Sequence, residues 1–127
     1  SSLKGDYYLW EPRSLDITKM QTAADLLVGE HDFSCFRGSL CQAKSPIKTI
    51  EYIQIESSTD ELIISIKANA FLHHMVRNIV GTLLKIGRGE KNIEWMTSVL
   101  ASKDRREAGP TAEPQGLYFI KAFYEEI

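Results

Sequence analysis

The chain has 127 residues, of which 43% are hydrophobic and 25% are charged, as expected for one globular domain with its own core. No apolar run approaches the roughly 18 residues of a membrane-spanning helix. The first residues lack the basic segment and apolar stretch of a secretory signal peptide. We therefore expect a single cytoplasmic domain over residues 1–127, and we exclude a membrane protein.

The charges are distributed unevenly along the chain. The net charge of −2 does not itself point to nucleic acid. However, residues 37–50 contain three basic residues and no acidic one, and residues 67–91 contain five basic residues against Glu90 alone. A chain of nearly neutral total charge can therefore present one positive face to phosphate groups.

In the first third of the chain, residues 7–10 predict a short strand that ends at Pro12. Ser14 or Asp16 can cap the helix that follows, and Gly29 is a favourable stop for it. Within the helix the apolar residues recur at helical spacing, at Ile17, Met20, Ala24, Leu27 and Val28.

Residues 30–45 show no regular pattern, and Phe33 and Phe36 are the expected core anchors there. Residues 48–57 alternate polar and apolar side chains and predict a strand whose inner residues are Ile50, Tyr52 or its neighbour Ile53, and Ile55. After a turn at residues 58–61, residues 62–67 alternate again. The two strands predict an antiparallel hairpin.

In the second half, residues 71–86 predict a long helix that is closed by Gly87 and Gly89. Asn92 can cap a further helix at residues 93–101. A loop at 102–115 leads to a last strand at 117–124. This order of elements predicts an α+β fold, with an antiparallel sheet and helices packed on one face.

On the long helix, residues four apart share a side. His73, Arg77, Gly81 and Lys85 form a polar stripe opposite a broad apolar face, and we expect the stripe to run along the domain boundary, facing outward. Gly81 costs about 1 kcal/mol of helix propensity relative to alanine. Such a glycine is useful where another backbone or an RNA strand comes close.

The sequence predicts no metal site. His73 and the next residue point about 100° apart on a helix and cannot chelate one ion together, and no HExxH pattern occurs. Cys35 and Cys41 are interpreted as buried or half-buried thiols, because two cysteines do not staple a domain of this size.

Three ordered segments resemble the tRNA pseudouridine synthase A (TruA) family. KANAFLHHMVRNIVGTLL at 67–84 is similar to the family signature, and HDFSCFR at 31–37 is similar to its NDFTSFR-type segment. SKDRREAGPTAEPQGLYF at 102–119 resembles the closing element. Together the match covers about residues 10–124.

The resemblance implies isomerisation of uridine to pseudouridine in the tRNA anticodon stem-loop, without a metal or organic cofactor. It implies that Arg77 orients the catalytic aspartate, because a guanidinium holds a carboxylate in fixed geometry. It also implies a pocket for a flipped-out base, lined by Leu117 and flanked by Gly116 and Tyr118. Expected phosphate contacts come from basic residues at the surface: His73, Lys85, Arg88, Arg37, Lys44 and Arg105.

The chain departs from the family pattern in one respect. The catalytic aspartate of the family lies in an Arg-Thr-Asp-Ala-Gly motif of the preceding half, and none of the six aspartates here has that context. We therefore expect the C-terminal lobe of a two-lobed enzyme, inactive without its N-terminal lobe and homodimeric when whole. The alternatives are a non-catalytic RNA-binding module and an α+β domain whose basic helix docks a protein.

Overall fold

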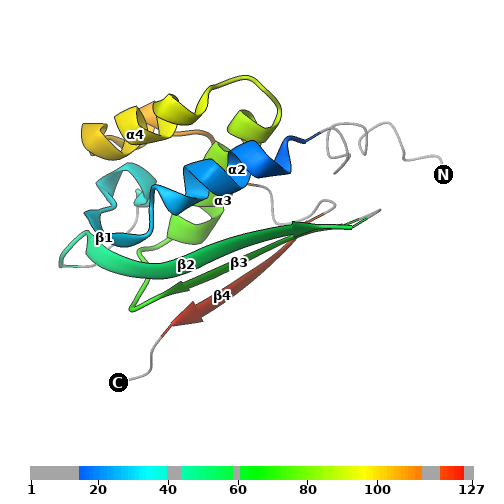
Figure 1. The fold of residues 1–127 in the computed structure, drawn as a ribbon. Helices are drawn as coiled ribbons and strands as arrows, with labels where there is room; N and C mark the ends of the chain where they lie inside the picture. The colour runs from blue at the N-terminus through cyan, green and yellow to red at the C-terminus, as the bar shows by residue number, and fades with distance from the viewer. Residues whose placement is uncertain (1–14, 40–43, 59–60, 113–117, 125–127) are drawn as a thin grey trace.

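A four-stranded sheet with helices on one face forms the protein in a computed structural model, which describes residues 15–39, 44–58, 61–112 and 118–124. The strand order is β1 (Gly29–Asp32), β2 (Ile47–Ser57), β3 (Leu62–Ala68) and β4 (Tyr118–Tyr124). Three helices lie on the same face of the sheet (Figure 1): α2 (Ile17–Asp25), α3 (Met75–Gly87) and α4 (Ile93–Ser102). The predicted α+β class is confirmed.

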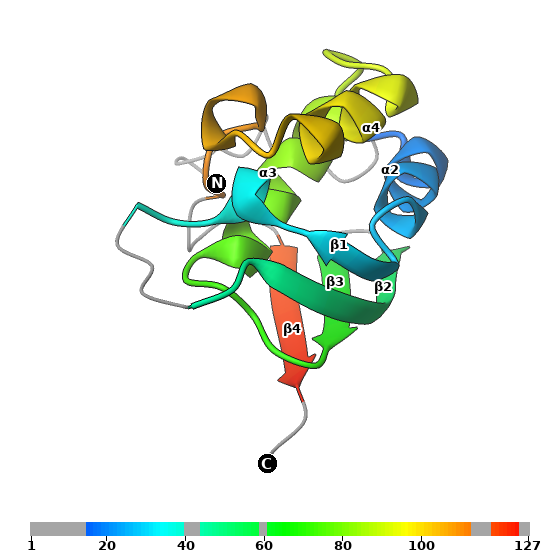
Figure 2. The same cartoon turned by 90° about the vertical axis from the view of Figure 1, so that its left-hand side faces the viewer.

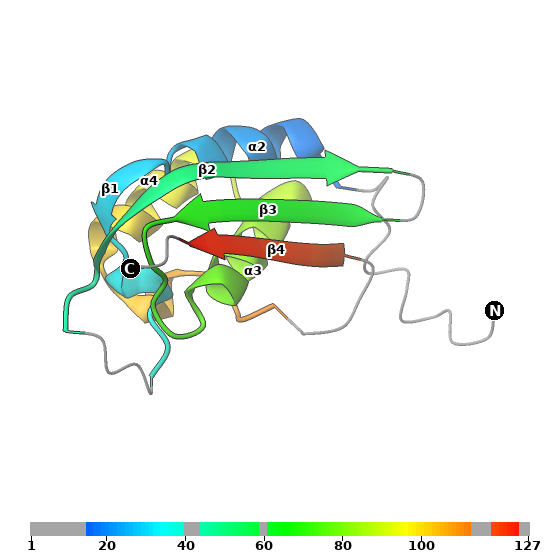
Figure 3. The same cartoon turned by 90° about the horizontal axis from the view of Figure 1, so that it is seen from below.

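The sheet is mixed, which corrects the expectation of a purely antiparallel one. The pairs β1–β2 and β2–β3 are antiparallel, but β4 runs parallel to β3 with Leu62 opposite Tyr118. Parallel neighbours need a long crossover connection. Here α3, α4 and the loop after them carry the chain back to the starting end of β3 before β4 begins (Figure 3).

Strand β2 contains an irregularity that decides which of its side chains enter the core. Its pairing with β3 shifts between Ile50 and Tyr52, and the inward residues are then Ile50, Ile53 and Ile55. Of the two alternatives that the sequence left open, Ile53 is therefore the buried one and Tyr52 is only half-buried. A bulge of this kind places two residues of one strand opposite one of its partner.

Strand β1 is shorter than β2 and pairs only with residues 47–50. Beyond it, the Gln21 side chain of α2 takes the place of a neighbouring strand. Its Nε2 donates to the Ile53 carbonyl at 2.7 Å, and its Oε1 accepts from the Ile55 amide at 2.9 Å. Two backbone groups of β2 that have no partner strand are satisfied in this way.

Two helix caps follow the sequence. Asp16 accepts a hydrogen bond from the Lys19 amide at 3.0 Å, and Asn92 accepts one from the Trp95 amide at 2.9 Å. Short polar side chains at these positions satisfy amides that the first turn leaves without partners. Phe33 and Phe36 are fully buried, which confirms them as core anchors.

Within the described ranges, every helix is too short or too polar to span a bilayer. The predicted strand at residues 7–10 lies outside the described residues.

Candidate functional site

The signature segment begins as a turn and becomes a helix at Met75, four residues later than predicted. His74 has a positive φ of 63°, which ends any helical path through the residues before it. The His73 and His74 rings lie 4.0 Å apart between centroids, and both side chains are exposed. The Gly38 amide donates to the His73 carbonyl at 2.8 Å and fixes this turn against the segment that follows Arg37.

Arg77 lies in the first turn of α3 and is half-buried. Its Nε donates to the Ala112 carbonyl at 2.9 Å, and its own carbonyl accepts from the Ala112 amide at 3.0 Å. Ala112 therefore holds both the backbone and the side chain of Arg77. No carboxylate of the described ranges forms an ion pair with this guanidinium.

Gly81 is buried, so the expectation that its stripe faces outward is wrong at this position. A Cβ added there would overlap the Pro110 carbonyl oxygen and lie 2.9 Å from the Pro110 carbonyl carbon. Of the two reasons considered for a glycine here, the close approach of another backbone is the one observed. Lys85, one turn further on, is half-buried.

A buried polar cluster that the sequence analysis did not find lies beside Arg77. Asn78 donates to the Phe36 carbonyl at 2.8 Å and accepts from the Thr111 hydroxyl at 2.5 Å. Thr82 accepts from the Gly109 amide at 2.9 Å. The sequence feature that could have revealed this cluster is a pair of polar residues, Asn78 and Thr82, four apart on a helix whose other inward residues are apolar.

Arg105, expected at the RNA surface, donates its hydrogen bonds within the protein. Its Nη1 donates to the Gly109 carbonyl at 2.7 Å. Its Nη2 donates to Asn78 Oδ1 at 3.1 Å and to the Thr111 hydroxyl at 3.2 Å. The guanidinium thus joins the loop after α4 to α3.

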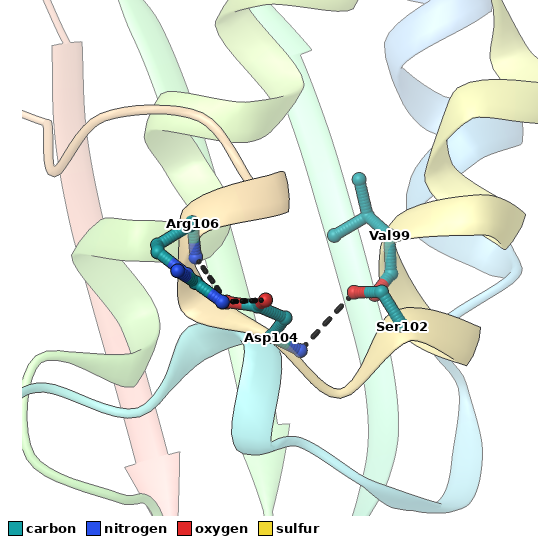
Figure 4. A network of polar contacts seen from close by, with 4 residues as sticks. All are labelled: Val99, Ser102, Asp104 and Arg106. Carbon is teal, nitrogen blue, oxygen red and sulfur yellow. Dashed lines mark hydrogen bonds and ion pairs between the residues drawn. The ribbon is translucent and has the colours of Figure 1, made fainter.

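The short helix η4 (Arg105–Glu107) is held by its own polar contacts (Figure 4). Asp104 accepts from the Arg106 amide at 2.9 Å and from its Nη2 at 2.9 Å, and the Asp104 amide donates to Ser102 Oγ at 3.1 Å. Donation from Arg106 lowers the pKa of the Asp104 carboxyl. Arg106 therefore turns outward, while Arg105 turns toward α3.

The remaining expected phosphate contacts do not form one group. Lys85 and Arg88 both pair with Glu90, at 3.2 and 3.0 Å, so their charge is partly neutralised at the far end of α3. Lys44 is exposed, and Arg37 is half-buried near the turn that holds His73.

Part of the expected base pocket lies outside the described residues. This applies to Leu117 and Gly116. The backbone of Tyr118 pairs with Leu62 at the start of β4. The last described residue before Gly116 and Leu117 is Ala112, which bonds to Arg77.

Two groups in the segment that leads to Phe36 have shifted pKa values. Burial raises the pKa of the Cys35 thiol to about 12, and the prediction of a buried thiol is confirmed for this cysteine. Cys41 lies outside the described residues. Donation from the Ser34 hydroxyl at 2.6 Å lowers the pKa of Asp32.

The described aspartates are occupied elsewhere. Asp16 caps α2, Asp25 accepts from Gln21, Asp32 accepts from Ser34, and Asp104 pairs with Arg106. Arg77 thus combines a fixed Nε with terminal nitrogens that these four carboxylates do not engage. The arrangement can orient an anionic group, but it holds no acid or base of its own among the described residues.

The profile of the tRNA pseudouridine synthase family matches residues 23–125, so the chain belongs to this family. Curated relatives carry the narrower name tRNA pseudouridine synthase A. The protein of that name from Hydrogenovibrio crunogenus is 48% identical over 126 residues, covering 99% of this chain and 48% of the relative. The one from Herminiimonas arsenicoxydans is 53% identical over 116 residues, covering 91% of this chain and 42% of the relative. The chain spans about half the length of the curated relatives it matches.

Proposed function

We propose that this chain supplies the arginine lobe of a tRNA pseudouridine synthase, an isomerase acting on uridines of the anticodon stem-loop. The single observation that carries the proposal is the setting of Arg77 within the matched family. It is half-buried, fixed through Nε, and not engaged by any described carboxylate.

The geometry of Arg77 limits how a carboxylate binds. The Nε–H donor is committed to Ala112, so a carboxylate approaches the two terminal nitrogens end-on. Such a pairing favours the ionised carboxylate and lowers its pKa. In the proposed reaction the carboxylate belongs to the catalytic aspartate, which acts on a uridine that has been flipped out of the RNA stack. The base is detached, rotated and rejoined through C5.

We propose that the aspartate comes from an N-terminal lobe outside these residues. The described aspartates have partners of their own, and no aspartate of the chain lies in an Arg-Thr-Asp-Ala-Gly sequence. The chain alone then binds RNA but does not isomerise it. The whole enzyme acts in the cytoplasm and needs no metal or organic cofactor.

Tritium release from an anticodon stem-loop labelled at uridine C5 tests the proposal. The chain alone is expected to release none. The chain joined to the preceding half of the Hydrogenovibrio crunogenus relative is expected to release tritium, and Arg77→Lys is expected to abolish that release because lysine lacks the planar fork. Release by the chain alone would contradict the missing aspartate, and full activity of Arg77→Lys would contradict the role of Arg77.

The same RNA distinguishes a binding module from an enzyme lobe. Steeply salt-dependent binding, without release by the joined protein, would favour a module that contacts phosphates through residues such as Lys44 and Arg37. Mutation of Lys44 is then expected to lower affinity more than mutation of Lys85, whose charge is shared with Glu90.

We propose that the whole enzyme is a homodimer. Ile47 and Phe123 are 50% and 46% exposed and, by alternation along their strands, lie on the sheet face away from the helices. Large exposed apolar side chains on one face are typical of contact surfaces. Sedimentation of the whole enzyme as a monomer at high concentration would contradict this.

A further inference from the structure

The segment 109–112 packs directly on α3 through its backbone. A Cβ on Gly109 would lie 2.9 Å from Thr82 Cα and 3.0 Å from the Gly81 carbonyl oxygen. The Gly109 amide bonds to Thr82, and the Ala112 amide and carbonyl both bond to Arg77. The guanidinium of Arg77 is therefore located by the backbone of this segment.

Arg105 holds the same segment on both sides of Pro110. One terminal nitrogen donates to the Gly109 carbonyl at 2.7 Å, and the other donates to the Thr111 hydroxyl at 3.2 Å. The second nitrogen also reaches Asn78, which accepts from Thr111 as well. Arg105, Thr111 and Asn78 thus form a clamp on residues 109–111. Its base is rigid, because Asn78 is 1% exposed and donates to the Phe36 carbonyl.

The three segments that carry the family resemblance meet at this clamp. Phe36 belongs to the first, Asn78 to the second, and Arg105 with Thr111 to the third. Figure 2 shows η3 (Ser34–Phe36) and η4 beside α3, on the helical side of the sheet. The clamp is thus a junction between segments that are distant in sequence.

We propose that Arg105 is a positioning residue that acts through Thr111 and Ala112 to fix the guanidinium of Arg77. The consequence of this positioning for catalysis rests on the proposed function, whereas the positioning itself does not. Arg105 fixes residues 109–111, and these residues place Ala112. Ala112 in turn fixes Nε of Arg77, so that the terminal nitrogens of Arg77 keep one direction. Arginine is required because its planar fork bonds three acceptors at once through two nitrogens, which a lysine ammonium on a flexible stem does not reproduce.

Side-chain and amide hydrogen exchange of this chain, followed by NMR, tests the proposal. In Arg105→Lys, exchange at Arg77 Nε–H and at the Gly109 and Ala112 amides is expected to become about tenfold faster, as a loosened hydrogen-bonded segment requires. The β2–β3 amides are expected to keep their protection. Arg106→Lys is the matched control and is expected to change none of these signals, because the Arg106 side chain is 88% exposed and pairs with its neighbour Asp104.

A second pair of variants keeps the test decisive if Arg105→Lys fails to fold. Thr111→Val removes the hydroxyl that accepts from Arg105 and donates to Asn78, and is expected to speed exchange at Arg77 Nε–H. Thr111→Ser keeps the hydroxyl and is expected to restore slow exchange. Unchanged Arg77 exchange in a folded Arg105→Lys or Thr111→Val protein would overturn the inference. Failure of the joined enzyme to release tritium, with these exchange changes present, would instead overturn the proposed function alone.

Discussion

Gly81→Ala offers a direct test of how closely the 109–112 segment approaches α3. Alanine is the better helix former by about 1 kcal/mol, so on helix propensity alone the substitution would stabilise the protein. The new methyl group would overlap the Pro110 carbonyl oxygen, which is backbone and cannot rotate away as a side chain does. We expect the segment to be displaced and the protein to be destabilised.

The magnitude follows from the hydrogen bonds that the displacement breaks. These are Gly109 to Thr82 and the two bonds between Ala112 and Arg77. At about 1 kcal/mol each, offset by the gain in helix propensity, the loss in unfolding free energy is about 2 kcal/mol. Urea denaturation followed by circular dichroism measures it.

Gly87→Ala is the control, because this glycine closes the same helix. There the added Cβ meets Met20 Sδ and lies 2.8 Å from Met20 Cγ, at the end of a flexible side chain that can move. We expect a smaller loss than in Gly81→Ala. Equal or greater stability of Gly81→Ala relative to the parent protein would refute the packing argument.

Three further predictions concern local chemistry. Asp16→Ala and Asn92→Ala are each expected to lower the unfolding free energy by about 1 kcal/mol through loss of a helix cap, and urea curves that overlay the parent would contradict this. In a Cys41→Ser background, Cys35 is expected to react with a disulfide reagent at pH 8 only when urea unfolds the protein, because burial raises its pKa to about 12; prompt labelling of folded protein would be inconsistent with that burial. The pKa of Asp32 is lowered on folding, so its contribution to stability is present above the unfolded pKa of about 4 and is lost as pH falls through the folded value. Asp32→Asn should therefore flatten the stability profile below about pH 5, and parallel profiles would count against it.

The elements that could be predicted from sequence are those with local signals. The alternation of β2 and β3 and the Asn92 cap of α4 appear in the sequence because each depends on neighbouring residues. The late start of α3 was missed, since the positive φ of His74 has no compositional mark. Strand β1 was missed because its four residues carry no alternating pattern.

The candidate site was only partly predictable for the same reason. Arg77 was found through the family signature, whereas the hydrogen bond that fixes its side chain is made to Ala112, 35 positions away. The role of Arg105 depends on Asn78, which is 27 positions away. A basic residue in a polar loop was therefore expected at the surface, although its guanidinium bonds inside the protein.

The Gln21 amide gives the sheet two unlike edges. Unpaired strand edges recruit other strands, but beyond the end of β1 the bonding groups at Ile53 and Ile55 are already taken by a side chain. A foreign strand would have to displace both of these bonds to pair there. At the other border of the sheet, no strand among the described residues flanks the outer side of β4. The helix that covers the core thus also occupies part of the β2 edge that β1 leaves open.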